Sequence, residues 1–117
     1  MALEIGPSQA LRLWRQVHLD LVRHSQADLS ARQTAILLTI YLELPPHTVR
    51  GLASQLGVTK PVITRALDTM GKLGLVSRKR DDFDRRNVVI QRTVAGALAV
   101  EKLADLVTER ARELGGA

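Results

Sequence analysis

Residues 48–80, TVRGLASQLGVTKPVITRALDTMGKLGLVSRKR, decide the fold. Within residues 49–56 the apolar side chains recur with the i, i+3, i+4, i+7 spacing of an amphipathic helix. Thr48 is suited to cap the start of this helix. Gly57 is suited to end it, because glycine adopts the left-handed conformation that closes many helices. The stretch therefore predicts a short helix followed by a tight turn.

A second helix is predicted directly after that turn. Thr59 stands at its expected N-cap, and Pro61 lies in its first turn, where a missing N–H costs little. Apolar side chains then recur at helical spacing as far as Leu73, and Gly74 is expected to end the helix. Two short helices joined by a tight turn form a helix-turn-helix.

Two short β-like runs follow, at residues 75–80 and 87–92. They flank the charged sequence DDFDRR at residues 81–86, which is typical of a turn. This arrangement predicts a β-hairpin with a charged tip, and a basic hairpin after a helix-turn-helix makes a winged helix-turn-helix.

The flanking sequence predicts three further helices. Residues 8–26 carry a helical apolar period. Ser30 and Gln33 have the spacing of a capping box, at the start of a helix that is apolar nearly all round and is therefore expected to be central and buried. A last amphipathic helix is predicted over residues 93–114, with Thr93 as its cap.

The positive charge is concentrated in the middle of the chain. The net charge is +5, whereas residues 48–92 alone carry ten basic residues against four aspartates. A localised basic region is the electrostatic pattern of a polyanion binder. A solvated basic face with no partner is an equal alternative on charge alone.

The N-terminal end of the second helix carries four polar side chains suited to contact nucleic acid, Thr59, Lys60, Thr64 and Arg65. The major groove of duplex DNA admits one α-helix, and the end that enters it also presents free N–H groups and a positive dipole. We therefore expect this helix to contact base edges and phosphates in the major groove.

The predicted hairpin supplies the second set of cations. Arg85 and Arg86 lie at its tip, where they would reach the adjacent minor groove. Arg78, Lys79 and Arg80 lie along one strand and are expected to contact phosphates, which position a protein on DNA without selecting a sequence.

Five stretches resemble the core of the multiple-antibiotic-resistance regulator (MarR) family. They are LSARQ (29–33), VRGLA (49–53), LGVTKPVITRALD (56–68), LGLVSR (73–78) and DRRNV (84–88), the last containing an Asp-x-Arg wing tip that begins at Asp84. The resemblance implies dimeric winged-helix transcription factors that bind pseudopalindromic DNA, often as repressors released by a small molecule. It also implies that Asp68 pairs with Arg86 and, with Asp84, orders the wing.

The sequence departs from the family pattern in three ways. One helix precedes the core and one follows it, whereas the resemblance implies a further dimerisation helix. Dimerisation would therefore be reduced, or would rest on the apolar side chains Trp14, Leu21, Leu103 and Val107. Arg92 stands where the family usually has an apolar residue. Cysteine is absent, which excludes the thiol-based oxidant sensing of some members.

With 117 residues, the chain suits a single domain. We expect one winged helix-turn-helix domain over residues 1–117, mainly α with a small β-hairpin wing and about five helices. Residues 30–92 would form its DNA-binding core, and the outer helices at 8–26 and 93–114 its dimer region.

Several other function classes are not supported. No Ser-His-Asp or paired-carboxylate arrangement indicates an enzyme, and no residue spacing indicates a metal or a cofactor. No apolar run is long enough to cross a membrane, and residues 1–7 do not resemble a secretion signal, so we expect a cytoplasmic protein. The alternative from another class is a winged-helix module that binds an acidic protein or the transcription machinery.

Overall fold

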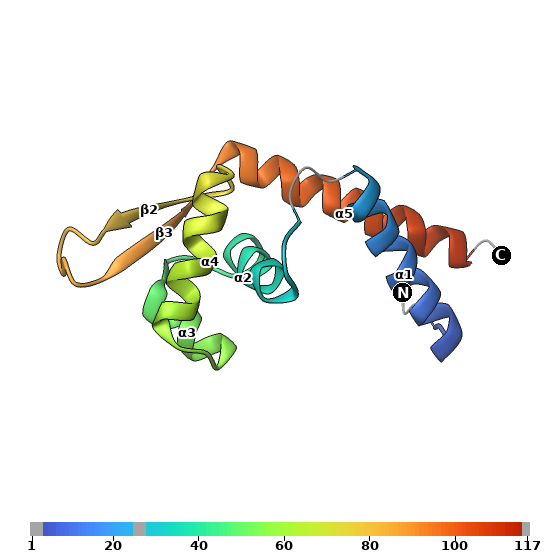
Figure 1. Ribbon diagram of the computed structural model, residues 1–117, viewed down its shortest axis with the longest axis horizontal. Coiled ribbons are helices and arrows are strands. Elements are labelled where there is room, and N and C mark those ends of the chain that lie inside the picture. Colours follow the sequence, from blue (N-terminus) through green and yellow to red (C-terminus); the bar gives the residue numbers. More distant parts are fainter. Residues whose placement is uncertain (1–3, 25–27, 116–117) are drawn as a thin grey trace. The chain divides into compact units, whose positions relative to one another are not determined.

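The computed structural model describes residues 4–24 and 28–115. The chain forms two compact units, one of residues 29–100 and one of residues 1–28 with 101–117, and each is described by itself. The helices and strands, shown in Figure 1, are α1 (Pro7–His24), α2 (Ala31–Leu42), β1 (His47–Thr48), α3 (Val49–Leu56), α4 (Lys60–Lys72), β2 (Val76–Arg80), β3 (Val88–Arg92) and α5 (Val94–Gly115).

Local capping explains where the helices of the 29–100 unit begin and end. Ser30 Oγ accepts a hydrogen bond from the N–H of Gln33 at 3.1 Å, and Gln33 Oε1 accepts one from the N–H of Ser30 at 2.8 Å. This confirms the predicted capping box. Thr48 Oγ1 caps α3 by accepting from the N–H of Gly51 at 2.9 Å, and Gly57 ends α3 in the left-handed conformation. Both predictions are confirmed.

The core of this unit lies between α2, α3, α4 and the sheet. Its fully buried large side chains are Ile36, Ile40, Leu52, Ile63, Leu67 and Met70. Two of them come from α2, which confirms the prediction of a central, buried helix. Because α4 contributes three of them, one side of this helix is fixed against the core and the other is left to solvent.

The predicted hairpin is present, within one residue of its expected ends. β2 and β3 are antiparallel, with Val76 opposite Arg92 and Arg80 opposite Val88. The sheet also contains β1, which pairs with β3 so that the strand order is β1-β3-β2. The sequence did not predict β1, because two residues are too few to show a strand period.

Arg92, which departs from the family pattern, joins the sheet to the end of α2. Its Nε donates to the Ile40 carbonyl at 2.8 Å and its Nη2 to the Glu43 carbonyl at 2.9 Å. Its guanidinium also lies 5.8 Å from the centroid of the Tyr41 ring. The last carbonyls of a helix have no partner within the helix, so a cation placed there satisfies them and interacts favourably with the helix dipole. An apolar residue would leave these bonds unmade.

The second unit contains α1 and the later turns of α5. The expected end of α1 at residue 26 lies outside the described residues, and the helix is described as far as His24. Asp20 is buried, and its two carboxylate oxygens accept from Nε and Nη2 of Arg110 at 2.7 and 3.0 Å. Arg110 also donates to Glu113, one turn further along α5. This bidentate pair joins α1 to α5.

The Asp20–Arg110 pair makes the stability of this unit depend on pH. The hydrogen bonds from Arg110 hold the pKa of the Asp20 carboxyl below its ordinary value. A carboxyl with a lowered folded-state pKa contributes stability above its unfolded pKa, near 4, and loses it as the pH falls through the folded pKa. We expect Asp20→Asn to lower the urea midpoint at pH 7, and this deficit to shrink as the pH falls below about 4. Equal deficits at pH 7 and pH 2.5 would contradict the assignment.

Candidate nucleic-acid interface

The solvent side of α4 carries the four polar side chains predicted at the start of the second helix. Thr59, Lys60, Thr64 and Arg65 are all exposed, whereas the apolar stripe that includes Ile63 is buried. The four predicted side chains therefore lie on the exposed part of one helix and the residue before it.

Thr59 stands at the N-cap of α4, as predicted, but the expected side-chain cap is wrong. Its backbone is extended, with φ −82° and ψ 158°, and its hydroxyl makes no capping hydrogen bond. Pro61, the second residue of α4, has no N–H to donate, and the N–H of the third residue, Val62, makes no bond to Thr59 either. The Thr59 hydroxyl is thus not committed to the cap.

The wing is tied to α4 by an ion pair that differs from the one the family resemblance implied. Asp68 Oδ1 lies 2.7 Å from Arg78 Nη2, whereas Arg86 pairs with Asp84 at 3.2 Å. The implied Asp68–Arg86 pair is therefore wrong for this structure. Arg78 lies near the start of β2, shortly after α4 ends, whereas Arg86 is two residues from Asp84 within the tip. Asp68 and Asp84 each hold one arginine of the wing region.

The acidic residues of the wing tip are occupied within the tip itself. Asp81 accepts from the N–H of Phe83 at 2.9 Å and from Asn87 Nδ2 at 3.4 Å, and the first of these bonds is the main cause of the lowered pKa of its carboxyl. Asp82 pairs with Lys79 at 3.5 Å. Engaged in this way, these carboxylates order the tip, although the loop is rich in acids.

The tip also exposes a side chain that the sequence analysis did not single out. Phe83 is fully exposed, while its backbone N–H is held by Asp81. Arg85 and Arg86 are exposed beside it, and Arg80 Nη1 donates to the Arg85 carbonyl at 2.7 Å. An aromatic residue within a charged turn is the sequence signal that would have identified Phe83.

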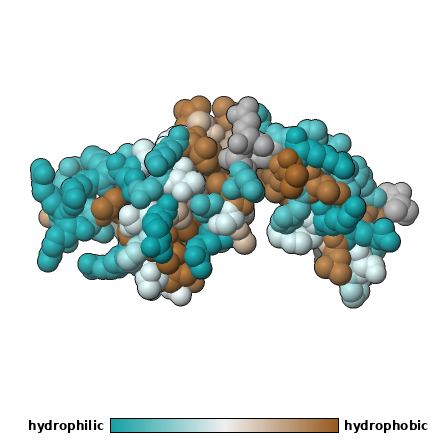
Figure 2. All heavy atoms as spheres, viewed as in Figure 1, coloured by the Kyte–Doolittle hydropathy of each residue, from teal (hydrophilic) through white to brown (hydrophobic). Residues whose placement is uncertain are grey.

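Basic residues outnumber acidic ones in the 29–100 unit, which contains both α4 and the hairpin. Residues 29–100 contain eleven Lys and Arg against five Asp and Glu, so the whole positive excess of the chain lies there. Figure 1 shows the β2–β3 hairpin extending beside α4. In the view of Figure 2, mostly hydrophilic residues cover the hairpin. Exposed cations on a helix and on a neighbouring hairpin form a surface suited to a polyanion.

The Asp68–Arg78 pair is expected to position the wing more than to stabilise the fold. The two side chains keep 50% and 35% of their accessible surface, and exposed ion pairs contribute little because water and salt screen them. A double-mutant cycle with Asp68→Ala and Arg78→Ala should give a coupling free energy of about 0.2–1 kcal/mol in urea unfolding. A coupling above about 2 kcal/mol would contradict this account.

Among residues 4–24 and 28–115, no group of three or more His, Asp or Glu side chains is placed to hold a metal ion. None of the described helices has the length and hydropathy of a transmembrane span.

The paired helices α3 and α4, the basic hairpin and the exposed cations define a winged helix-turn-helix protein. A comparison with models of protein families leads to the same class of protein, because the model of the MarR family matches residues 29–88. The chain belongs to the MarR family.

Individual relatives show the same likeness. The organic hydroperoxide resistance transcriptional regulator of Bacillus subtilis (strain 168) is 39% identical over 71 residues, which are 61% of this chain and 48% of that protein. The chain thus spans about half the length of this curated relative. A crystal structure of a mutant of MarR from E. coli is 27% identical, with a TM-score of 0.71 over 95% of this chain and 84% of that one.

A further solved structure shows a similar fold with DNA present. It is the transcriptional repressor CouR bound to a 23-mer DNA duplex, which is 24% identical, with a TM-score of 0.72 over 91% of this chain and 72% of that one. At this identity the likeness concerns the fold alone.

Proposed function

We propose that this protein is a transcription regulator that binds duplex DNA at specific sequences. In this proposal α4 enters the major groove, where Lys60, Thr64 and Arg65 meet base edges and phosphates. The wing lies along the adjacent minor groove. Arg85 and Arg86 enter this groove, and Phe83 adds an apolar contact.

The observation that carries this proposal is the exposure of cationic side chains on two neighbouring elements, α4 and the hairpin. Lys60 and Arg65 on α4 are exposed and make no ion pair with any described residue, while the acids of the wing tip are engaged locally. Arg78 is instead held by Asp68, and we assign it to fixing β2 rather than to a strong phosphate contact. We assign phosphate contacts to Lys79 and Arg80, which are exposed, although Lys79 would have to give up its 3.5 Å pair with Asp82.

We also propose that the protein acts in the cytoplasm as a homodimer without catalytic activity. Membership of a family of regulators supports this, as do exposed apolar side chains on the outer helices, among them Trp14 and Val107. Leu21 and Leu103, also assigned to the interface, are half-buried. Such a dimer would place its recognition helices about 34–36 Å apart, which fits half-sites about 10 bp apart.

The test is selection of bound duplexes from a random DNA library, followed by anisotropy titrations of the selected site at several salt concentrations. We expect a pseudopalindromic motif, and a logarithm of the association constant that falls by about 0.9 per phosphate neutralised as the logarithm of the salt concentration rises. Selection without an enriched motif, or an affinity equal to that for a scrambled duplex, would contradict sequence-specific binding. Preference for an acidic protein over DNA in competition would favour the interaction-module alternative.

A further inference from the structure

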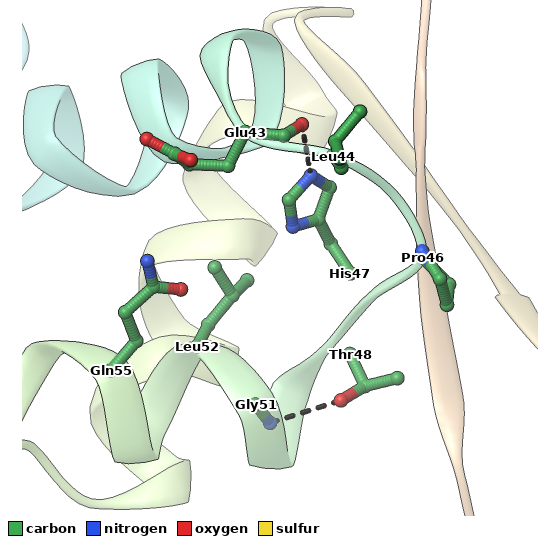
Figure 3. Close-up of a pocket in the computed structure, with 8 residues that line it drawn as sticks. All are labelled: Glu43, Leu44, Pro46, His47, Thr48, Gly51, Leu52 and Gln55. Atoms are coloured by element: carbon green, nitrogen blue, oxygen red, sulfur yellow. Dashed lines mark hydrogen bonds between the residues drawn. The ribbon is translucent and has the colours of Figure 1, made fainter.

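A pocket of about 320 Å³ lies within the 29–100 unit, outside the surface assigned to DNA. It is bounded by the chain that leaves α2 at Glu43, by β1 and by α3. Its size matches the lower end of small-molecule sites, which begin near 300 Å³. Figure 3 shows its side chains, with Glu43 and Gln55 on one side and His47 between the end of α2 and Leu52.

The hydrogen bonding of His47 determines what the pocket offers a ligand. His47 is 93% buried, and its Nε2 lies 3.2 Å from the carbonyl oxygen of Glu43. A carbonyl only accepts, so Nε2 carries the proton in this contact. In the neutral ring Nδ1 is then an acceptor, and it has no hydrogen-bond partner among the described residues.

Nδ1 is open to the pocket rather than sealed in the core. No buried side-chain nitrogen or oxygen of the described residues lacks a partner, so an unpartnered Nδ1 must reach the surface. In Figure 3 this nitrogen faces the side of the pocket from which Leu52 and Gln55 project. It is an acceptor held in place by a buried ring.

The lining gives the pocket a negative character within a basic unit. Glu43 is the only charged residue that lines it, and no Lys or Arg does. Arg92 reaches the same Glu43 carbonyl from β3 but is not a lining residue. Leu44 and Pro46, which are exposed, supply apolar surface beside the acceptors, whereas Leu52 is buried. The pocket thus offers a carboxylate, an imidazole nitrogen that accepts when the ring is neutral, and some apolar surface.

From this geometry we infer that the pocket binds a small, flat organic cation whose N–H groups donate to Glu43 and to Nδ1 of His47. A planar cation with two or more donors, such as an amidinium, meets both acceptors while its apolar body lies against the other lining residues. An anionic ligand of the same shape would face the Glu43 carboxylate without a compensating cation in the lining.

The experiment uses three probes of one shape and different charge: benzamidine, neutral benzamide and benzoate. Each is titrated into the ¹⁵N-labelled full chain without DNA, and the amide signals of residues 43–55 are followed by NMR. We expect benzamidine to bind with a dissociation constant of about 1 mM or tighter, the scale for a ligand this small. Benzamide and benzoate should bind at least about fivefold more weakly, the scale of one partly exposed charge interaction.

Three variants locate the site. Glu43→Gln should weaken benzamidine about fivefold, and Gln55→Glu, which adds a carboxylate to the lining, should strengthen it by a similar factor. Glu109→Gln removes the same charge from a residue that does not line the pocket and should leave the affinity unchanged. No saturable shift below 10 mM, equal binding of benzamide, or preference for benzoate would each overturn the inference, whatever the outcome of the DNA experiments.

Discussion

Arg65→Ala will weaken binding to the selected DNA site about ten- to hundredfold for each half-site. Arg65 is exposed on the solvent side of α4, in the second turn of the helix, and it is not engaged in an ion pair with any described residue. An arginine that makes a bidentate contact to a guanine contributes about 1–3 kcal/mol of discrimination, and the loss applies once for each half-site. Affinity measured by anisotropy at fixed salt tests this, with the urea midpoint measured in parallel.

Arg112→Ala is the matched control. Arg112 is an exposed arginine in the last turn of α5, outside the 29–100 unit, so its loss removes the same charge without touching α4. We expect it to reduce affinity less than about threefold, as a general electrostatic effect. Two results would contradict the assigned site: equal losses for both variants, or no loss for Arg65→Ala.

The salt dependence separates two roles for Arg65. If Arg65 contacts a phosphate, its removal would lower the salt slope by about 0.9 per contact and weaken binding to all sequences alike. If it contacts a base, its removal would instead narrow the difference in affinity between the selected and scrambled duplexes. Arg65 lies on the exposed side of α4 with Lys60 and Thr64, the side assigned to base edges. We therefore expect Arg65→Ala mainly to narrow the difference in affinity between the two duplexes, with a smaller effect on the salt slope.

The sequence predicted those parts of the fold that depend on neighbouring residues. Thr48 starts α3 and Gly57 ends it, while Ser30 and Gln33 start α2. The capping hydrogen bonds join residues three apart in the sequence, and Gly57 acts through its own left-handed conformation. The side of α4 that faces solvent follows from the apolar period of its other side. The positions of Lys60 and the neighbouring site residues on an exposed helix end were therefore predictable.

Features that depend on distant residues were not predictable in the same way. Asp68 has several arginines within reach along the chain, and only the course of β2 brings Arg78 to it. The pocket requires Glu43, His47 and Gln55 to converge from three elements, and no periodicity indicates that convergence. The carbonyl that orients the His47 ring belongs to a backbone position, which sequence reasoning does not locate.

The close packing of Gly96 also depends on residues that are distant in the sequence. Tyr41 Oη donates to the Leu75 carbonyl at 2.6 Å and accepts from the N–H of Thr93 at 3.0 Å. A Cβ atom at Gly96 would overlap both Tyr41 Oη and the Leu75 carbonyl oxygen. Glycine at this position therefore lets the first turn of α5 lie against the end of α2 and the start of the hairpin.

Gly96→Ala will destabilise the fold by about 2–3 kcal/mol, although alanine is the better helix former. Relief of the overlap requires moving either the Leu75 backbone or Tyr41, and moving Tyr41 leaves the N–H of Thr93 without its partner. Gly71→Ala in α4 is the opposite case. A Cβ atom at Gly71 would meet no heavy atom within 4 Å beyond its own helix backbone and chain neighbours, and Gly71 has no positive φ. The substitution should therefore stabilise the fold by about 0.5–1 kcal/mol. Urea unfolding at constant m-value measures both changes. If Gly96→Ala raises the midpoint, as Gly71→Ala should, helix propensity and not contact at the Tyr41 hydroxyl governs position 96.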